Sequence, residues 1–362
     1  MKVLTGEVLA ANTWTCNLRC SYCFVRKTDK MKEDEFMSPE TAVRVIDALD
    51  EGLSEINRIR VHLYGGEPFI NLPAIEAMVK RAGDKKPGRI GFVVTTNGTI
   101  LSDAVIDLLE AGKFDIVLSI DGPAEVHDAC RKRVDGSPTH RDVMRFLETV
   151  RSRTSCYVTG AAVIRSGWRL LYASEYLRTL PIDNVKAQAV RLAAGTPYAL
   201  TEEDMKLYQQ DLEAIGRQVI KELEAEKVPM DRRFAGRVMK LLIKGEGLMR
   251  YCDAGKSNLG ITPSGVVKAC LLVDEEDAVL GHVNDDVEVW KQAGLKWQER
   301  PLRKKCTSCS YLQLCGGGCP AVVPVCGDEE CKIVHKECDV ANVIYEHFSD
   351  KQENLLGLVG IV

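Results

Sequence analysis

Short apolar segments alternate with helical patterns over much of this 362-residue sequence, and this alternation limits the folds that are open to it. Two helices have clear start signals, a Ser-Pro-Glu at Ser38 and a Thr-Glu-Glu-Asp at Thr201. Parallel strands joined by right-handed helical connections curl toward a barrel. We therefore predict an α/β protein, a partial (β/α)6 TIM-like barrel with its site at the carboxyl ends of the strands. The six strands are expected at Glu7–Trp14, Arg58–Tyr64, Arg89–Thr96, Phe114–Ile120, Cys156–Ile164 and Asn184–Leu192.

Composition and charge exclude several classes of protein. Hydrophobic residues make up 45% of the chain, which is enough for one large core or two smaller ones. The 48 Lys and Arg nearly balance the 52 Asp and Glu, so no overall charge attracts nucleic acid or an anionic membrane. The sequence shows neither the apolar stretch of a signal peptide nor a run long enough to span a bilayer. We expect a cytoplasmic protein with no nucleic-acid and no membrane partner.

The fourteen cysteines are unevenly spread along the chain. Three lie near the amino terminus, and nine fall between Cys252 and Cys338. Cytoplasmic cysteines are normally reduced, so close spacing indicates metal or redox chemistry before disulfides. We predict two separate metal-binding regions, and we expect the isolated Cys130 and Cys156 to be structural thiols.

The stretch TCNLRCSYCF, which starts at Thr15, places Cys16, Cys20 and Cys23 within eight residues. Three thiolates can hold three irons of a [4Fe–4S] cluster and leave the fourth iron open to another ligand. Zinc normally takes four protein ligands, and this loop has no further Cys or His, although a distant residue could supply one. The spacing therefore favours the cluster, with zinc or three buried thiols as the alternatives.

The spacing Cys16-x3-Cys20-x2-Cys23 after a first strand resembles the signature of radical S-adenosylmethionine enzymes. The resemblance implies that these cysteines hold the catalytic cluster and that Tyr22 lies against the adenine of S-adenosylmethionine. A Gly-Gly-Glu-Pro motif after the second strand strengthens it, because paired glycines let a backbone approach a ligand closely. The glutamate can contribute to an ammonium-binding environment. The residues implied to contact the methionine part are Gly65, Gly66, Glu67 and Pro68.

Later strand ends carry further matches to the same family. They are Asn97 in TTNG, Ser119 and Asp121 in SIDGP, Arg131 in HDACRKR and Leu192 in AVRL. The resemblance implies that all five bind the cofactor. Arg131 is expected at the carboxylate, which suits a guanidinium fork, and Leu192 is expected in the adenine pocket. A solvated surface arginine and an ordinary core leucine are the alternatives.

The cysteines near the carboxyl terminus resemble a SPASM domain, the twin-cluster extension of radical S-adenosylmethionine enzymes. The pattern contains Gly265-x4-Cys270 and Cys306-x2-Cys309-x5-Cys315-x3-Cys319. The resemblance assigns the first auxiliary cluster to Cys252, Cys270 and Cys319, and the second to Cys306, Cys309, Cys315 and Cys338. The chain would then hold three [4Fe–4S] clusters. The expected domains are a radical S-adenosylmethionine partial barrel (1–230), a helical bridge (231–250), a SPASM domain (251–345) and a tail (346–362).

One departure from the sulfatase-maturing branch bears on function. That branch has another Cys soon after the first SPASM ligand and an Asp after the next, whereas residues 253–269 contain no Cys and Leu271 follows Cys270. The first auxiliary cluster would then have an open iron that can bind a substrate thiolate, as in thioether-forming relatives. Alternatively, Cys326 or Cys331 completes the cluster, and the sequence leaves both options open.

The resemblance implies reductive cleavage of S-adenosylmethionine to methionine and a 5′-deoxyadenosyl radical. We expect the radical to oxidise a peptide or protein side chain, with thioether or other cross-link formation favoured. Formylglycine maturation and small-molecule radical oxidation are alternatives, and a non-catalytic iron–sulfur electron carrier or a zinc-stabilised interaction protein comes from another class. An electron donor such as flavodoxin or ferredoxin is implied. Only 15 residues precede Cys16, so we expect any leader-peptide-binding protein to be separate.

Overall fold

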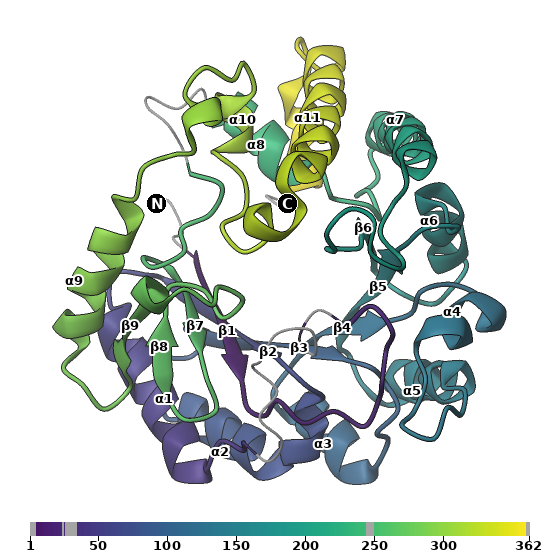
Figure 1. The fold of residues 1–362 in the computed structure, drawn as a ribbon. Helices are drawn as coiled ribbons and strands as arrows, with labels where there is room; N and C mark the ends of the chain where they lie inside the picture. The colour runs from purple at the N-terminus through teal and green to yellow at the C-terminus, as the bar shows by residue number, and fades with distance from the viewer. Residues whose placement is uncertain (1–4, 24, 26–34, 244–249, 360–362) are drawn as a thin grey trace. The chain divides into compact units, whose positions relative to one another are not determined.

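The computed structural model describes residues 5–23, 25, 35–243 and 250–359 (Figure 1). The chain divides into two compact units. The first unit contains Met1–Ser119, His127–Val158 and Asp253–Arg300, and the second contains Ile120–Val126, Thr159–Cys252 and Pro301–Val362.

Four parallel strands form the centre of the first unit, in the spatial order β4-β3-β2-β1. They are β1 (Thr5–Ala11), β2 (Arg58–Tyr64), β3 (Ile90–Thr96) and β4 (Asp115–Ser119). The last residues of β1 and β2, Ala11 and Tyr64, lie side by side, so their carboxyl ends meet at one edge. Helices α1, α2 and α3 cover the same side of the sheet (Figure 1). The helices of this unit are α1 (Pro39–Gly52), α2 (Leu72–Gly83), α3 (Asp103–Ala111) and α5 (His140–Arg153), and α4 (Ala124–Cys130) enters it from the second unit.

Three short strands continue this sheet beyond β1, and the sequence did not predict them. β7 (Asn258–Ile261) pairs in parallel with β1, and β8 (Val266–Lys268) and β9 (Val279–His282) follow as antiparallel neighbours. The helix α9 (Val287–Gln298) packs on α1, where the Trp290 indole fills the space beside Gly52. A Cβ at Gly52 would lie only 2.0 Å from that ring. The extension therefore depends on close packing with the strands and helix of the barrel.

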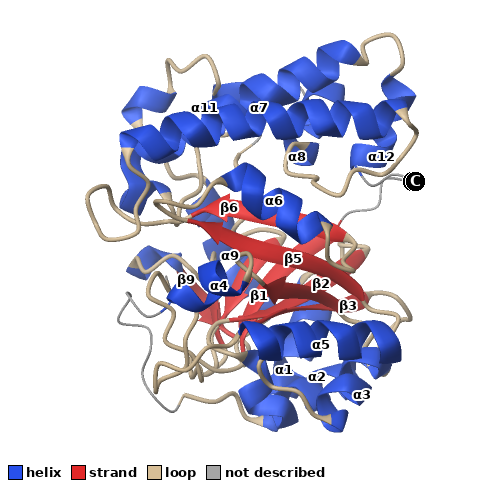
Figure 2. Cartoon of the chain, turned by 90° about the vertical axis from the view of Figure 1, so that its right-hand side faces the viewer, coloured by secondary structure: helices blue, strands red, loops and turns tan. Residues whose placement is uncertain are grey.

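The second unit combines two parallel strands with long helices. The strands are β5 (Tyr157–Ile164), whose first two residues belong to the first unit, and β6 (Asn184–Ala189). The helices are α6 (Leu170–Arg178), α7 (Glu202–Glu224), α8 (Ala235–Ile243), α10 (Leu312–Cys315), α11 (Val323–His347) and α12 (Leu356–Val359). α7 and α11 lie side by side (Figure 2), and they meet closely because Gly216 has no Cβ to collide with Val340. α11 bends at Gly327, whose φ of 54° and ψ of −125° are not helical.

The predicted fold class is confirmed, since the protein is mixed α/β with parallel strands and each of the six expected strands is present. Both helix starts are confirmed as well. The Ser38 side chain accepts a hydrogen bond from the Thr41 N–H, and Thr201 forms a capping box with Asp204. Short 3₁₀ turns occupy Pro68–Asn71, Glu276–Ala278, Lys304–Cys306 and Gln352–Leu355.

The expected domain boundaries stay a prediction, and parts of those domains lie outside the described residues, namely 1–4, 24, 26–34, 244–249 and 360–362. Among the helices that the structure describes, none is long and apolar enough to cross a membrane.

The loop after β2 is joined by hydrogen bonds to the segment that follows β1. The Gly66 N–H donates to the Thr13 carbonyl at 3.0 Å, and the Glu67 N–H donates to the Thr15 carbonyl at 2.8 Å. Gly65 has a φ of 126°, a backbone conformation that residues with a side chain rarely adopt. A Cβ on Gly66 would lie 2.0 Å from the Thr15 carbonyl oxygen. Both glycines are therefore needed for this close backbone contact.

The Glu67 carboxylate connects the same loop to the end of β3. It accepts hydrogen bonds from Thr96 Oγ1 at 2.8 Å, the Asn97 N–H at 2.7 Å and the Phe69 N–H at 3.3 Å. Glu67 is 1% exposed, and burial raises its pKa from 4.5 to about 7 although these hydrogen bonds lower it. The side chain thus joins the carboxyl ends of β2 and β3.

We predict that Gly66→Ala destabilises the iron-free protein by about 1–3 kcal/mol, the usual cost of overpacking, because the new methyl group meets backbone atoms that cannot rotate away. Gly83→Ala is the control, since nothing lies within 4 Å of a Cβ built there. Urea unfolding of both variants measures the effect. Equal midpoints for the two variants would contradict the packing argument.

Glu67→Gln should also destabilise the iron-free protein, by about 1–3 kcal/mol, because one buried donor loses its acceptor. Each carboxyl oxygen keeps a lone pair even when protonated, whereas the amide nitrogen of glutamine has none. The exposed Glu76→Gln is the matched control.

The pH dependence of this difference is a further check. The folded-state pKa of Glu67 is raised, so wild-type protein loses stability as the pH rises from about 4.5 to about 7. Glutamine does not titrate, so the difference in unfolding free energy between wild-type protein and Glu67→Gln should shrink over this pH range. A cost for Glu67→Gln that grows with pH would show that the carboxylate is the favoured form.

Candidate functional site

The cysteine loop begins four residues after β1 and is held by backbone hydrogen bonds to the segment that carries Arg131. The Arg19 N–H donates to the Lys132 carbonyl at 2.7 Å, and the Ser21 N–H donates to the Cys130 carbonyl at 3.2 Å. Cys16, Cys20 and Cys23 are all partly exposed, and none of them is in a disulfide. The sequence separates these two segments by more than a hundred residues, and the fold brings them together.

Two donors point at the sulfur of Cys16. The Leu18 N–H lies 3.4 Å from Cys16 Sγ, and Asn97 Nδ2 lies 3.8 Å from it. Asn97 is itself held by a hydrogen bond from Nδ2 to Asn17 Oδ1 at 2.9 Å. Burial raises the pKa of the Cys16 thiol to about 12, so Cys16 would have to lose this proton to act as the predicted iron ligand. Donors around the resulting thiolate are the environment that an iron–sulfur ligand requires.

Tyr22 and Arg131 lie against each other beside this loop. The Arg131 guanidinium carbon is 5.5 Å from the centre of the Tyr22 ring, within cation–π range, and Tyr22 is 6% exposed. The sequence predicted that the two side chains contact different parts of one ligand. Their adjacency fits that prediction.

The remaining predicted cofactor contacts have different surroundings. In the first unit, Ser119 is the last residue of β4 and is 8% exposed, and the buried Pro68 begins a 3₁₀ turn. In the second unit, Asp121 Oδ1 accepts a hydrogen bond from the Val163 N–H at 3.1 Å, so this carboxylate binds the backbone of β5. The Leu192 carbonyl accepts a hydrogen bond from Cys326 Sγ at 3.6 Å. Cofactor contacts at Ser119, Pro68, Asp121 and Leu192 stay predictions.

An apolar cluster lies next to the cysteine loop. Leu271 is 1% exposed and packs with Ala11, Trp14 and Val25, and Cys23 and Tyr64 pack against this cluster. The position after Cys270 therefore holds a buried apolar side chain in place of an acid. Tyr64, the last residue of β2, is a site residue that sequence reasoning missed. Burial raises the pKa of its phenol to about 12, and the nearby Cys23 and Cys270 add to the rise. Its place directly before Gly65 was the available signal.

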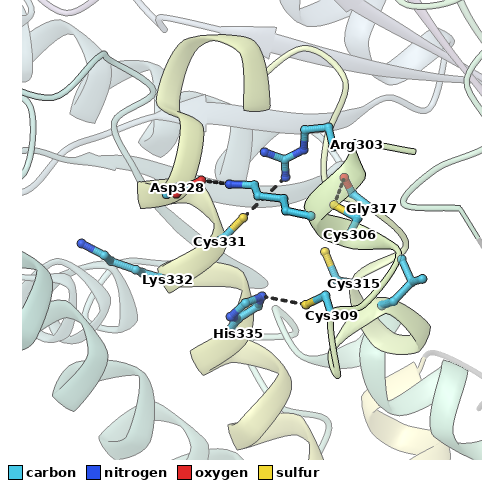
Figure 3. A pocket seen from close by; sticks show the side chains of 11 residues that line it. Arg303, Cys306, Cys309, Cys315, Gly317, Asp328, Cys331, Lys332 and His335 are labelled. Carbon is cyan, nitrogen blue, oxygen red and sulfur yellow. Dashed lines mark hydrogen bonds and ion pairs between the residues drawn. The ribbon is translucent and has the colours of Figure 1, made fainter. Parts of the chain in front are cut away.

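Three of the four cysteines expected at the second auxiliary cluster line one cavity of about 310 Å³ in the second unit (Figure 3). They are Cys306, Cys309 and Cys315. The fourth, Cys338, lies on α11, is 1% exposed and interacts electrostatically with Cys315. Burial raises the pKa of Cys338 to about 11. Four thiols in one region of this unit match the ligand number of a [4Fe–4S] cluster.

The two additional cysteines of α11 lie in different places. Cys331 lines the same cavity as Cys306, and the Arg303 guanidinium donates to its sulfur at 3.5 Å (Figure 3). Cys326 Sγ donates a hydrogen bond to the Leu192 carbonyl, and Cys326 interacts electrostatically with Cys319.

The remaining cysteines are divided between the two units. Cys270 belongs to the first unit, and Cys252 and Cys319 belong to the second. Cys130 and Cys156 are 2% and 5% exposed, which is consistent with structural thiols. The fourteen cysteines, all of which lie within the described residues, form no disulfide bonds. Within the described ranges, no three Cys, His, Asp or Glu side chains are arranged to hold a single metal ion.

Comparison with known proteins identifies a domain family and several relatives. Residues 13–167 match the radical SAM superfamily. The chain is 21% identical to the radical SAM cyclopropyl synthase TigE of Paramaledivibacter caminithermalis, over 98% of this chain and 77% of that protein. It is 25% identical to the serine-type anaerobic sulfatase-maturating enzyme of Klebsiella aerogenes, over 86% of this chain and 79% of that protein.

Solved structures show the same fold. The anSMEcpe protein with bound AdoMet superposes with a TM-score of 0.80 and 19% identity, over 98% of both chains. SuiB of Streptococcus suis, bound to its precursor peptide SuiA, superposes with a TM-score of 0.64 and 15% identity, over 88% of this chain and 72% of that chain. The match of residues 13–167 covers the cysteine loop, the glycine pair, Asn97 and Arg131, so the chain is an enzyme that carries a radical S-adenosylmethionine domain over these residues.

Proposed function

We propose that this enzyme oxidatively modifies a side chain of a peptide or protein, with thioether or another cross-link as the favoured product. The observation that carries the proposal is the cysteine loop, with Tyr22 and Arg131 packed together beside it. When bound, the cluster and S-adenosylmethionine supply one-electron chemistry that yields methionine and a 5′-deoxyadenosyl radical, which removes hydrogen from an unactivated carbon. The protein binds and positions the reactants.

The roles of individual side chains follow from their surroundings. Arg131 would bind the carboxylate of S-adenosylmethionine, and Tyr22 would lie against its adenine. The Gly65-Gly66 backbone can approach the methionine part because no side chain intervenes. Glu67 uses its carboxylate oxygens to hold Asn97 and the end of β3, so we assign it a positioning role. This supports the predicted site and gives Glu67 a more specific task.

The peptide substrate rests on two lines of support. One sequence relative is a sulfatase-maturating enzyme, and one structural neighbour was solved with a precursor peptide bound. The buried Leu271 favours a cross-link over formylglycine maturation, because it leaves no acid at the position where the sulfatase-maturing branch is expected to carry one. In this proposal, the residues of the first auxiliary set, Cys252, Cys270 and Cys319, would hold a cluster with an open iron that could bind a substrate thiolate. Completion of that cluster by Cys326 or Cys331 is the alternative.

The proposed setting of the enzyme is the cytoplasm, where flavodoxin or ferredoxin would supply electrons. A separate protein would bind the leader segment of the substrate. Direct recognition of a short substrate is the alternative to this partner.

Cys20→Ala should abolish reductive cleavage of S-adenosylmethionine, because it removes an iron ligand of the cluster that supplies the electron. Cys156→Ala is the control, since this buried thiol donates to the Leu109 carbonyl and belongs to none of the predicted ligand sets. Anaerobic assays with dithionite measure 5′-deoxyadenosine. Normal 5′-deoxyadenosine production by Cys20→Ala would overturn the assignment of the cysteine loop.

The reconstituted enzyme should contain about 12 iron and about 12 sulfide per chain, because the cysteines divide into three ligand sets for [4Fe–4S] clusters. Cys309→Ala should lower the iron content by about a third, whereas Cys156→Ala should leave it unchanged. Iron, sulfide and zinc analysis after anaerobic reconstitution checks this. Folded protein that retains zinc and only one cluster's iron would reject the assignment.

A further inference from the structure

One face of α11 carries side chains that are suited to an iron–sulfur cluster. Cys331, His335 and Cys338 are spaced by four and three residues, so they lie on the same side of the helix. Cys331 and His335 both line the cavity that contains Cys306, Cys309 and Cys315 (Figure 3). His335 belongs to no ligand set that the spacing of the cysteines predicts.

The His335 imidazole is aimed at one of the expected ligands. Its Nε2 lies 3.6 Å from Cys309 Sγ, which is a hydrogen-bond distance for sulfur (Figure 3). The Tyr311 ring stacks on the imidazole with their centres 4.1 Å apart and their planes 12° from parallel. The Tyr311 hydroxyl donates to Asp339 Oδ1 at 2.8 Å. Asp339 follows His335 by one helical turn, so Tyr311 contacts α11 at both residues, and its ring packs against the imidazole.

The direction of the hydrogen bond follows from the chemistry of Cys309. Without iron, either the thiol or the imidazole can be the donor. An iron-bound cysteine is a thiolate and has no proton to donate, so the imidazole must then donate through Nε2. A hydrogen bond to a ligand sulfur withdraws electron density from the cluster and stabilises its more negative, reduced state. The reduction potential of the cluster rises as a result.

We propose that His335 donates an Nε2–H hydrogen bond to Cys309 Sγ and thereby raises the reduction potential of the second auxiliary cluster. The inference rests on the proposed function, which places that cluster at Cys306, Cys309, Cys315 and Cys338. His335 is a positioning residue that acts through Cys309. Arg303, whose guanidinium donates to Cys331 in the same cavity, brings a fixed charge that variants of His335 leave untouched.

The test is a redox titration of the full-length chain monitored by electron paramagnetic resonance. Replacing Cys16, Cys20 and Cys23 by Ala in every sample removes the signal of the amino-terminal cluster. His335→Phe keeps a planar ring on Tyr311 and removes the N–H donor. Tyr311→Phe keeps the stacked ring and removes only the hydrogen bond to Asp339, so it is the matched control.

We expect His335→Phe to shift one auxiliary cluster to a more negative midpoint potential, with unchanged iron content and an unchanged second midpoint. Tyr311→Phe should shift neither midpoint. Identical midpoints in the parent and His335→Phe would overturn the proposal. Loss of about four iron from His335→Phe would also overturn it, because His335 would then be a ligand.

A second measurement does not depend on how well the variants fold. In the parent protein with ¹⁵N-labelled histidine, the reduced auxiliary clusters should show one weakly coupled histidine nitrogen. Absence of this coupling, or the strong coupling of a directly bound nitrogen, would refute the hydrogen bond. If Cys309→Ala loses no iron, the cluster assignment itself fails and this inference falls with it. If that iron is lost but the His335→Phe midpoints do not move, only the role of His335 fails.

Discussion

The carboxylate of Glu67 is the contact on which the geometry of the radical site depends. It is fully buried, and it joins the loop after β2 to the end of β3 through Thr96 and Asn97. The same loop binds residues 13–15 through backbone hydrogen bonds, directly before the first cysteine. Three strand ends are therefore connected at one point. The placement of Asn97 near Cys16 follows from this connection, so an error in the loop would be passed to an expected iron ligand.

The cysteine loop has no regular secondary structure of its own, and its backbone is held by partners that are distant in sequence. Hydrogen bonds to Cys130 and Lys132 hold it against the segment that contains Arg131. This arrangement places an aromatic ring and a guanidinium next to each other.

In the second unit, one long helix provides several thiols. α11 packs on α7, and its bend at Gly327 separates Cys326 from Cys331. Cys326 is next to Leu192, whereas Cys331 faces the cavity of the second auxiliary set. Two cysteines of the same helix, only five positions apart, therefore have different neighbours. The helix also brings His335 to Cys309, which makes it a source of both ligands and donors.

Local sequence was enough to predict the six parallel strands, the caps at Ser38 and Thr201 and the N-terminal cysteine loop, because alternation, capping and ligand spacing depend on neighbouring residues. It did not predict β7, β8 and β9, since strands of three or four residues carry too little periodicity and depend on pairing with β1 or with one another. Tyr64 and His335 were missed for a related reason. Their importance comes from Cys270 and Cys309, which are far away along the chain, and only the tertiary structure brings such residues within contact distance.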